Sequence, residues 1–370
     1  MNKILFYDSY FTGHHSEYVN NILTYFSQYP PINQKVYLAI HQKVEEMLDL
    51  KNTEIKNIEI VLLPNDVNEK RFFGKLDVIK QITDKYGINH VILLWINSLM
   101  LDLAFGKYRF VVSGIVFYPF NPHYEKYSLF MRIQKEIMYF LVSKRQKIKK
   151  LFILNDQKTC IYLNRHFHTH KFQYLPDPIP LYEQEKLPDE IMEITKKRKI
   201  ILHFGAMSER KGTLLILDTI TTLSSDIIAK TSFFFVGKPI NEAFGKLLKD
   251  RISQLQTQFL DISIFYNPCF VSVGQMESYY ELSNFVLMPY LSNNMSSGVL
   301  GHAAKHNKPV ITGKGLLGEL VKQYHLGIAI EPCTKSLKYA ISTMLTKHPN
   351  NQDTKYVDEH TCGVFVETLF

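Results

Sequence analysis

Short apolar runs rich in β-branched and aromatic residues alternate along the whole chain with longer amphipathic runs. The first pattern is typical of buried strands and the second of helices that cover a sheet. Their alternation predicts βα units, and therefore an α/β fold built on parallel sheets. We expect strands at 3–7, 35–40, 58–62, 90–95, 110–117, 151–154 and 172–175, and again at 200–204, 232–236, 262–265, 285–288, 309–312 and 328–330.

A proline cluster interrupts this alternation near the middle of the chain. Pro176, Pro178 and Pro180 fall within five residues, and neither a helix nor a strand ladder continues through them. We therefore predict two Rossmann-like domains that face each other across a cleft, with ligands at the carboxyl ends of the strands. The first domain covers 1–178, a linker 179–198, the second domain 199–347, and a tail helix 348–370.

Composition and charge narrow the function classes. Apolar residues make up 46% of the 370 residues and charged residues 21%, which excludes a disordered or collagen-like chain. The net charge of +8 favours anionic partners such as phosphates, nucleic acid or an acidic membrane surface. The aromatic residues are not interleaved with Lys and Arg in a nucleic-acid-binding module, so we expect no nucleic-acid partner.

The sequence contains no sign of export or of a membrane span. Asp8 interrupts the first apolar run before a signal peptide could form, and the longest apolar stretch, 91–105, is shorter than the roughly 20 residues that cross a bilayer. The four cysteines form no CxxC pair, which argues against a disulfide framework or a zinc site. We expect a cytoplasmic protein.

Three strand-to-helix turns are candidates for chemistry. Gly13 follows the first strand, and a glycine there lets the backbone approach a ligand beside a helix N-terminus. The structural alternative is a plain turn, with Ser16 as the N-cap and His14 and His15 on the surface.

The second turn contains Gly205, Arg210, Lys211 and Gly212. Two adjacent cations at a strand-to-helix transition fit the recognition of a diphosphate, although such cations are also common on solvated faces. In the third turn, an Asn- and Ser-rich loop leads into the segment 297–299. The first N–H groups of a helix there would bind phosphate, unless Ser297 is only an ordinary N-cap.

In order and spacing these segments resemble the nucleotide-sugar-dependent glycosyltransferases of GT-B fold, of the retaining family 4 type. The resemblance covers about 200–332, whereas in the first half only Gly13 matches. The matching motifs are Phe204-Gly205 with Lys211-Gly212, the strand ending in Pro289-Tyr290, Ser297-Gly298-Val299 leading to Lys308-Pro309-Val310-Ile311, Leu317-Gly318-Glu319-Leu320-Val321, and the turn from Gly327 to Pro332.

The sequence also departs from that family. The paired glutamates of the family, of which the second holds the donor ribose, fall at Asn293 and Gly301. A frequent arginine falls at Ala206, and a histidine after the fifth strand is replaced by Tyr118, with His123 nearby. The chain thus resembles a branch that carries Ser-Gly-Val and lacks the acidic pair.

The resemblance implies transfer of a sugar, with retention, from a UDP- or GDP-linked donor to a glycan, a lipid-linked molecule or another hydroxyl acceptor in surface polysaccharide or glycoconjugate biosynthesis. It implies no cofactor, and the lack of an Asp-x-Asp motif fits catalysis without a metal. The catalytic residues would be Lys211 and Arg210. The donor would contact Gly205, Lys211, Arg210, Phe270, Ser297, Gly298, Val299 and Glu319, and the acceptor side would hold Gly13, His14, His15 and His123.

A further amphipathic segment spans 127–150. Its apolar residues Phe130, Ile133, Ile137, Phe140 and Leu141 have roughly helical spacing, and five of the seven residues 144–150 are Lys or Arg. Such a helix could lie on an acidic membrane surface as a peripheral attachment, or it could be a packed helix whose cationic end favours the helix dipole.

Two other functions remain as alternatives. A different α/β nucleotide enzyme, such as a dehydrogenase, is disfavoured because no GxGxxG follows either first strand. A non-catalytic subunit of GT-B shape would account for the missing acidic pair.

Overall fold

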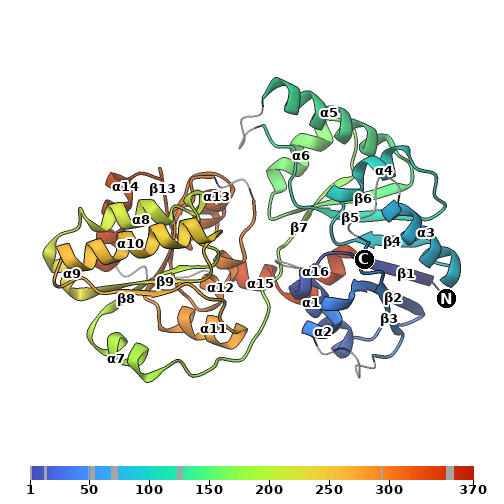
Figure 1. Cartoon of the computed structure of the whole chain (residues 1–370). Coiled ribbons are helices and arrows are strands. Elements are labelled where there is room, and N and C mark those ends of the chain that lie inside the picture. The colour runs from blue at the N-terminus through green and yellow to red at the C-terminus, as the bar shows by residue number, and fades with distance from the viewer. Residues whose placement is uncertain are drawn as a thin grey trace. The chain divides into compact units, whose positions relative to one another are not determined.

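The computed structural model describes residues 2–11, 15–48, 50, 55–67, 74–122, 128–292, 295–346 and 354–370. It divides into two compact units, here called unit 1 (Met1–Pro180 with His360–Phe370) and unit 2 (Leu181–Glu359). Each unit contains one parallel sheet with helices between its strands (Figure 1). The predicted α/β class and the two Rossmann-like domains are confirmed. Gly13, His14, His123 and Asn293 lie outside the described residues.

Unit 1 is built on a seven-stranded sheet in the order β3-β2-β1-β4-β5-β6-β7. Both faces of this sheet are covered: along β1, Ile4 and Phe6 join one buried cluster, whereas Leu5 and Tyr7 join the other. Its elements are β1 (Asn2–Asp8), α1 (His15–Gln28), β2 (Gln34–His41), α2 (Gln42–Met47), β3 (Ile58–Leu63), α3 (Gly74–Tyr86), β4 (His90–Leu93), η2 (Asn97–Leu99), α4 (Met100–Phe105), β5 (Val111–Val116), α5 (Leu129–Lys144), β6 (Ile148–Leu154), α6 (Gln157–His166), β7 (Phe172–Leu175) and α16 (Cys362–Leu369).

Unit 2 is built on a six-stranded sheet in the order β10-β9-β8-β11-β12-β13. Side chains of α8, α10 and α14 bury one face of this sheet against residues such as Ile201 and Phe233. Its elements are α7 (Asp189–Lys197), β8 (Lys199–Phe204), η3 (Glu209–Lys211), α8 (Thr213–Ile220), α9 (Ser225–Lys230), β9 (Thr231–Val236), α10 (Glu242–Gln258), β10 (Ile264–Asn267), α11 (Val273–Leu282), β11 (Phe285–Met288), α12 (Gly298–Lys305), β12 (Val310–Gly313), α13 (Leu316–Gln323), β13 (Gly327–Ile330), α14 (Thr334–Thr346) and α15 (Lys355–Glu359).

All thirteen expected strands are present, most of them within two residues of the predicted bounds. The expectation of one helical segment over 127–150 is wrong at its end. Helix α5 stops at Lys144, and Ile148 instead begins β6. Ile148 is fully buried and pairs with Val112 of β5, so burial of a β-branched side chain in the sheet decides the local structure.

The last residues of the chain return to unit 1. The segment 348–370, predicted as a tail helix, contains two short helices in its described part. The first, α15, contacts α12 in unit 2, whereas α16 packs on α1 and β7 in unit 1 (Figure 1). Phe365, Val366 and Leu369 of α16 are completely buried there.

Candidate functional site

The strand order reverses once in each sheet, beside the first strand of each unit. In unit 1 this switch point lies between β1 and β4, and in unit 2 between β8 and β11. Ligands of open parallel sheets bind outside the carboxyl ends of the strands at such a point. The chain segments after β8 and β11 contain most of the predicted donor residues, and the segment after β1 contains His15.

In unit 2 the segments after β8 and β11 converge. Gly205 has a φ of +98°, and a Cβ placed on it would lie 3.0 Å from Lys211 Nζ and 3.9 Å from Val299 Cγ2. Gly212 has a φ of +73°, and a Cβ there would lie 2.3 Å from the carbonyl oxygen of Pro289. Both positions therefore require glycine. These two close approaches bring the Lys211 ammonium group over the switch point, next to the start of α12.

The aromatic ring of Tyr290 lies beneath both predicted cations. Its ring centroid lies 5.4 Å from Lys211 Nζ and 5.9 Å from Arg210 Cζ, in cation–π geometry. The Leu291 N–H also donates to the Arg210 carbonyl oxygen at 2.8 Å, which ties the two loops together. The Tyr290 ring is buried, the Lys211 side chain is half-buried and the Arg210 side chain is exposed, so of the two charges it is Arg210 that faces solvent.

The N-terminus of α12 completes this cluster. Ser297 is its N-cap residue, but its hydroxyl makes no capping bond within the described residues and lies 3.4 Å from the Tyr290 hydroxyl. The first N–H groups of α12 are thus not occupied by their own N-cap side chain. Together with the helix dipole and Lys211, they form an electropositive site suited to an anion such as a phosphate group.

A buried histidine holds the β8–α8 turn in shape. His203 Nδ1 lies 3.0 Å from the Leu287 carbonyl oxygen, which only accepts, so Nδ1 donates and Nε2 faces the Thr213 hydroxyl at 2.9 Å. Burial, assisted by the charge of Lys211, lowers the pKa of His203 to about 4. His203 is therefore neutral at pH 7, and its two hydrogen bonds tie the start of α8 to β11.

Two other predicted donor residues lie at the same edge of the sheet but farther along it. Phe270 follows β10 and is 84% exposed, with Lys238 Nζ 5.7 Å from its ring centroid. Glu319 lies in the first turn of α13, after β12. Gly301, where the resemblance places a ribose-binding glutamate, is buried within α12, and the neighbouring His302 is directed to Glu277.

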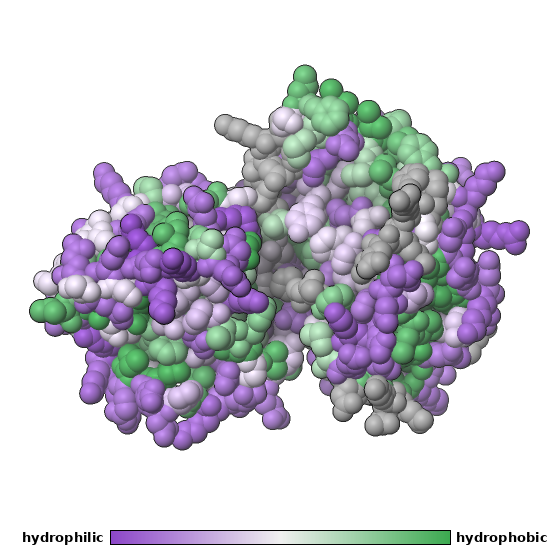
Figure 2. Space-filling model, in the orientation of Figure 1, coloured by the Kyte–Doolittle hydropathy of each residue, from purple (hydrophilic) through white to green (hydrophobic). Residues whose placement is uncertain are grey.

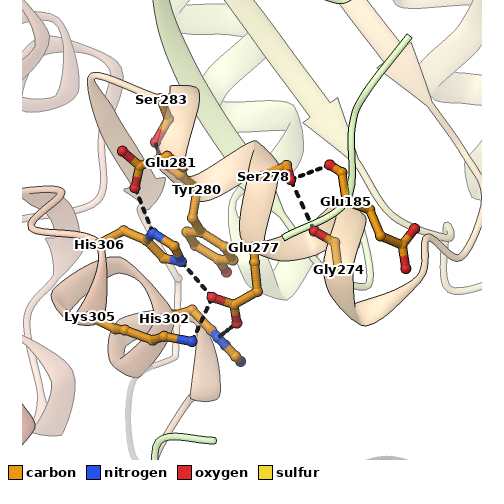
Figure 3. A network of polar contacts seen from close by, with 10 residues as sticks. All are labelled: Glu185, Gly274, Glu277, Ser278, Tyr280, Glu281, Ser283, His302, Lys305 and His306. Atoms are coloured by element: carbon orange, nitrogen blue, oxygen red, sulfur yellow. Dashed lines mark hydrogen bonds and ion pairs between the residues drawn. The ribbon is translucent and has the colours of Figure 1, made fainter. Parts of the chain in front are cut away.

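Glu277, which was not among the predicted residues, holds α12 against α11 (Figure 3). Its carboxylate comes from α11, is fully buried, and accepts from His302 at 3.0 Å, Lys305 at 2.8 Å and His306 at 2.5 Å. Burial alone would raise the pKa of this carboxyl, but the hydrogen bonds from the two histidines and the lysine hold it well below its ordinary value. His306 also donates to Glu281 at 2.9 Å, so both of its nitrogens face carboxylates.

Helix α11 is in turn attached to the segment that begins unit 2. The Glu185 N–H donates to the Gly274 carbonyl oxygen at 3.1 Å, and the Ser272 hydroxyl donates to the Glu185 carboxylate at 2.7 Å. The Ser278 hydroxyl adds a bond to the Glu185 carbonyl oxygen (Figure 3). The segment before α7, helix α11 and helix α12 therefore form one connected polar network.

In unit 1 the switch point holds a buried acid–histidine pair. His15 Nδ1 lies 2.7 Å from Asp8 Oδ2, and both side chains are almost completely buried. Burial raises the pKa of Asp8, and the bond to His15 opposes this effect. His15 is therefore not on the surface, as the plain-turn alternative required, but is fixed to the end of β1.

Aromatic rings from three strand ends surround His15. Tyr10 stacks on the imidazole at 5.2 Å between centroids, and Trp95 and Phe117 follow at 5.0 and 6.1 Å. Trp95 and Phe117 also stack on each other at 4.6 Å. These rings were not among the predicted site residues. Their only signal was that each follows a predicted strand or lies at its end.

No protein-family model matches the chain, and no curated protein matches its sequence. Several solved structures have a similar fold. Anabaena HepE in complex with UDP and glucose is 14% identical with a TM-score of 0.70, and the match covers 100% of this chain and 98% of that one. The lipopolysaccharide biosynthesis glycosyltransferase WaaG is 15% identical (TM-score 0.61; 97% and 99% covered). Sucrose-phosphate synthase of Thermosynechococcus elongatus is 14% identical (TM-score 0.69; 100% and 96%).

These similarities extend over nearly the full length of both chains in each case. The chain therefore has the GT-B fold of these glycosyltransferases. The part of the chain that the structure describes has no helix long and apolar enough to span a bilayer.

Proposed function

We propose that the protein is a nucleotide-sugar-dependent glycosyltransferase in which unit 2 binds the donor and unit 1 the acceptor. The fold supports this assignment, because HepE binds UDP and UDP-glucose and WaaG is a glycosyltransferase. WaaG, which acts in lipopolysaccharide biosynthesis, supports a role in the synthesis of surface polysaccharide or another glycoconjugate.

One observation carries the proposal: the convergence of Gly205, Lys211 and the α12 N-terminus at the switch point of unit 2. The donor diphosphate would bind at this electropositive site, and the exposed Arg210 side chain would contact it from the solvent side. Phe270, whose ring is open to solvent, would stack on the nucleotide base, and Glu319 would bind the sugar or ribose.

Catalysis would rest mainly on charge. As the bond from the sugar to the phosphate breaks, negative charge grows on the departing diphosphate, and preplaced cations and N–H groups stabilise that charge. Lys211 and Arg210 would supply the cations, and Gly298 and Val299 the N–H groups. The departing phosphate would take the proton of the acceptor hydroxyl on the same face of the sugar, which gives retention without a metal.

The Asp8–His15 pair favours a second mechanism on the acceptor side. A histidine whose Nδ1 is held by a buried carboxylate has the orientation of a general base. With His15 as the base, the acceptor would attack from the opposite face and the product would have inverted configuration. The anomeric configuration of the first product, read by proton NMR, distinguishes the two mechanisms.

The test of donor binding is thermal shift with UDP, GDP, ADP and CMP. A ligand at 100 times its dissociation constant adds about 2.7 kcal/mol to the stability of the folded protein. We expect a shift with one diphosphate in the wild type and in Lys249→Ala, which alters an exposed lysine of α10, and its loss in Lys211→Ala. The absence of a shift with any nucleotide would favour the non-catalytic subunit instead.

A further inference from the structure

Helix α5 exposes an apolar stripe that no other element covers in the part of unit 1 that the structure describes. Phe130, Ile133, Ile137 and Phe140 follow each other at steps of three, four and three residues, which places them on one side of the helix. They are 77, 48, 55 and 49% exposed. Figure 2 shows hydrophobic side chains gathered over α5, at the top of the view.

The opposite side of α5 packs into the hydrophobic core of unit 1. Tyr139 and Val142 are completely buried in the cluster that covers one face of the sheet. The neighbouring helix α4, which contacts α5, adds the exposed side chains of Leu101 and Phe105. Helix α5 is therefore held to unit 1 without the exposed stripe. A contiguous exposed apolar patch of this kind marks an interaction surface.

A cluster of cations continues from the end of this stripe. Lys144 lies four residues after Phe140, so it extends the stripe, and its ammonium group lies 5.6 Å from the centroid of the Phe140 ring. Arg145, Lys147 and Lys149 follow in the next five residues. The side chains of Lys144, Lys147 and Lys149 are exposed.

The fold adds a lysine from another strand to this cluster. Lys171, just before β7, donates to the Arg145 carbonyl oxygen at 2.6 Å. Burial, together with the positive charges of Lys149 and Lys144, lowers the pKa of Lys171. These ammonium groups are thus close enough to repel one another, and an anionic surface would relieve that repulsion.

We propose that α5 docks unit 1 onto a bilayer surface that contains anionic phospholipid. The apolar stripe would enter the boundary between headgroups and acyl chains, while Lys144 and the following cations contact lipid phosphates. Long lysine side chains at the end of an apolar stripe reach the polar layer while their methylene groups stay on the apolar surface. The Lys144 ammonium group, which also donates to the Phe167 carbonyl oxygen at 2.9 Å, is exposed at this end of the stripe. This surface is independent of donor binding, so its test does not depend on the proposed activity.

The experiment is flotation of the full-length protein with vesicles of phosphatidylcholine, alone or mixed with phosphatidylglycerol, at low and high salt. The wild type should float with the mixed vesicles, and less at high salt. The double variant Phe130→Glu/Ile137→Glu should stay in the soluble fraction. The control Ile32→Glu changes another exposed apolar residue of unit 1, 83% exposed, and should float like the wild type.

A charge variant tests the second half of the proposal. Each basic residue near an anionic surface contributes a factor of about five to partitioning, so Lys147→Gln/Lys149→Gln should weaken binding to mixed vesicles by about 30-fold. Two controls separate lost binding from unfolding. The milder double variant Phe130→Ser/Ile137→Ser should also lose flotation, and circular dichroism should show that the variants keep the helix content of the wild type. Equal flotation of wild type and stripe variants would overturn the proposal. So would a dimer that forms through α5 without lipid and does not float.

Discussion

Glu277→Gln is the most informative single substitution in unit 2, because it removes the charge that joins α11 to α12 and leaves the shape of the side chain. Lys305 and His306, whose side chains are only 16 and 6% exposed, would then lose the Glu277 carboxylate, and only His306 would keep a second one, that of Glu281. Removing one partner of a buried ion pair costs about 3–5 kcal/mol. Glutamine still accepts one hydrogen bond, so we expect about 3 kcal/mol.

For a domain of 150–250 residues, 1 kcal/mol corresponds to about 2–4 °C in melting temperature. Glu277→Gln should therefore lower the transition of unit 2 by about 6–12 °C in scanning calorimetry at pH 7. Glu281→Gln is the matched control. Glu281 also bonds to His306, but its side chain is 54% exposed, so its loss should cost less than about 1 kcal/mol.

The pH dependence gives a second, independent check. Because folding lowers the pKa of Glu277 below its ordinary value of 4.5, its contribution to stability is present above pH 4.5 and is lost as the pH falls below it. The gap between wild type and Glu277→Gln should narrow in that range. A melting difference below about 2 °C at pH 7, or a gap that widens in acid, would refute this account of the network.

Gly212→Ala should destabilise unit 2 by about 3 kcal/mol in urea unfolding, because a Cβ at positive φ would meet Pro289; a loss below about 1 kcal/mol would contradict the geometry. Because folding lowers the pKa of His203 from 6.5 to about 4, the unfolded chain binds the proton first as the pH falls. The free energy of unfolding should therefore fall by about 3 kcal/mol between pH 6.5 and 4, and His203→Gln should make this dependence on pH less steep. Equal pH dependence in the wild type and the variant would be evidence against this role of His203. Phe270→Ala should weaken nucleotide binding about 5- to 100-fold in calorimetry but leave inorganic phosphate binding unchanged, and equal losses would exclude base stacking. Sugar transfer should continue in excess EDTA, whereas a loss that Mg²⁺ or Mn²⁺ restores would show that a metal takes part.

The strands were predictable because each is a short run of apolar residues, and this local composition alone indicates a buried strand. Phe172–Leu175 and Phe285–Met288 match the expected bounds at both ends. The helix–strand border at Ile148 was not predictable in this way. It depends on pairing with Val112, a contact 36 residues away in the chain that local periodicity does not contain.

The candidate site was partly predictable for the same reason. The glycines and cations of the β8–α8 turn are neighbours in sequence, and the fold brings them to the α12 N-terminus. Glu277 carries no local signal, because its partners lie 25 to 29 residues later on another helix. His15 itself was predicted on the acceptor side, but the rings that surround it were likewise hidden, since they come from the ends of three different strands.

The return of α16 to unit 1 sets an order for folding during synthesis. Unit 1 is interrupted in sequence by the whole of unit 2, and its core lacks Phe365, Val366 and Leu369 until residues 362–370 have left the ribosome. Phe370 itself packs on Phe6, 364 residues earlier, at 5.5 Å between ring centroids. Unit 2, which is continuous, can close first, even though it is translated second. The N-terminal unit would therefore keep an open apolar groove along α1 until residues 362–370 are synthesised, at a stage when nascent chains depend on chaperones.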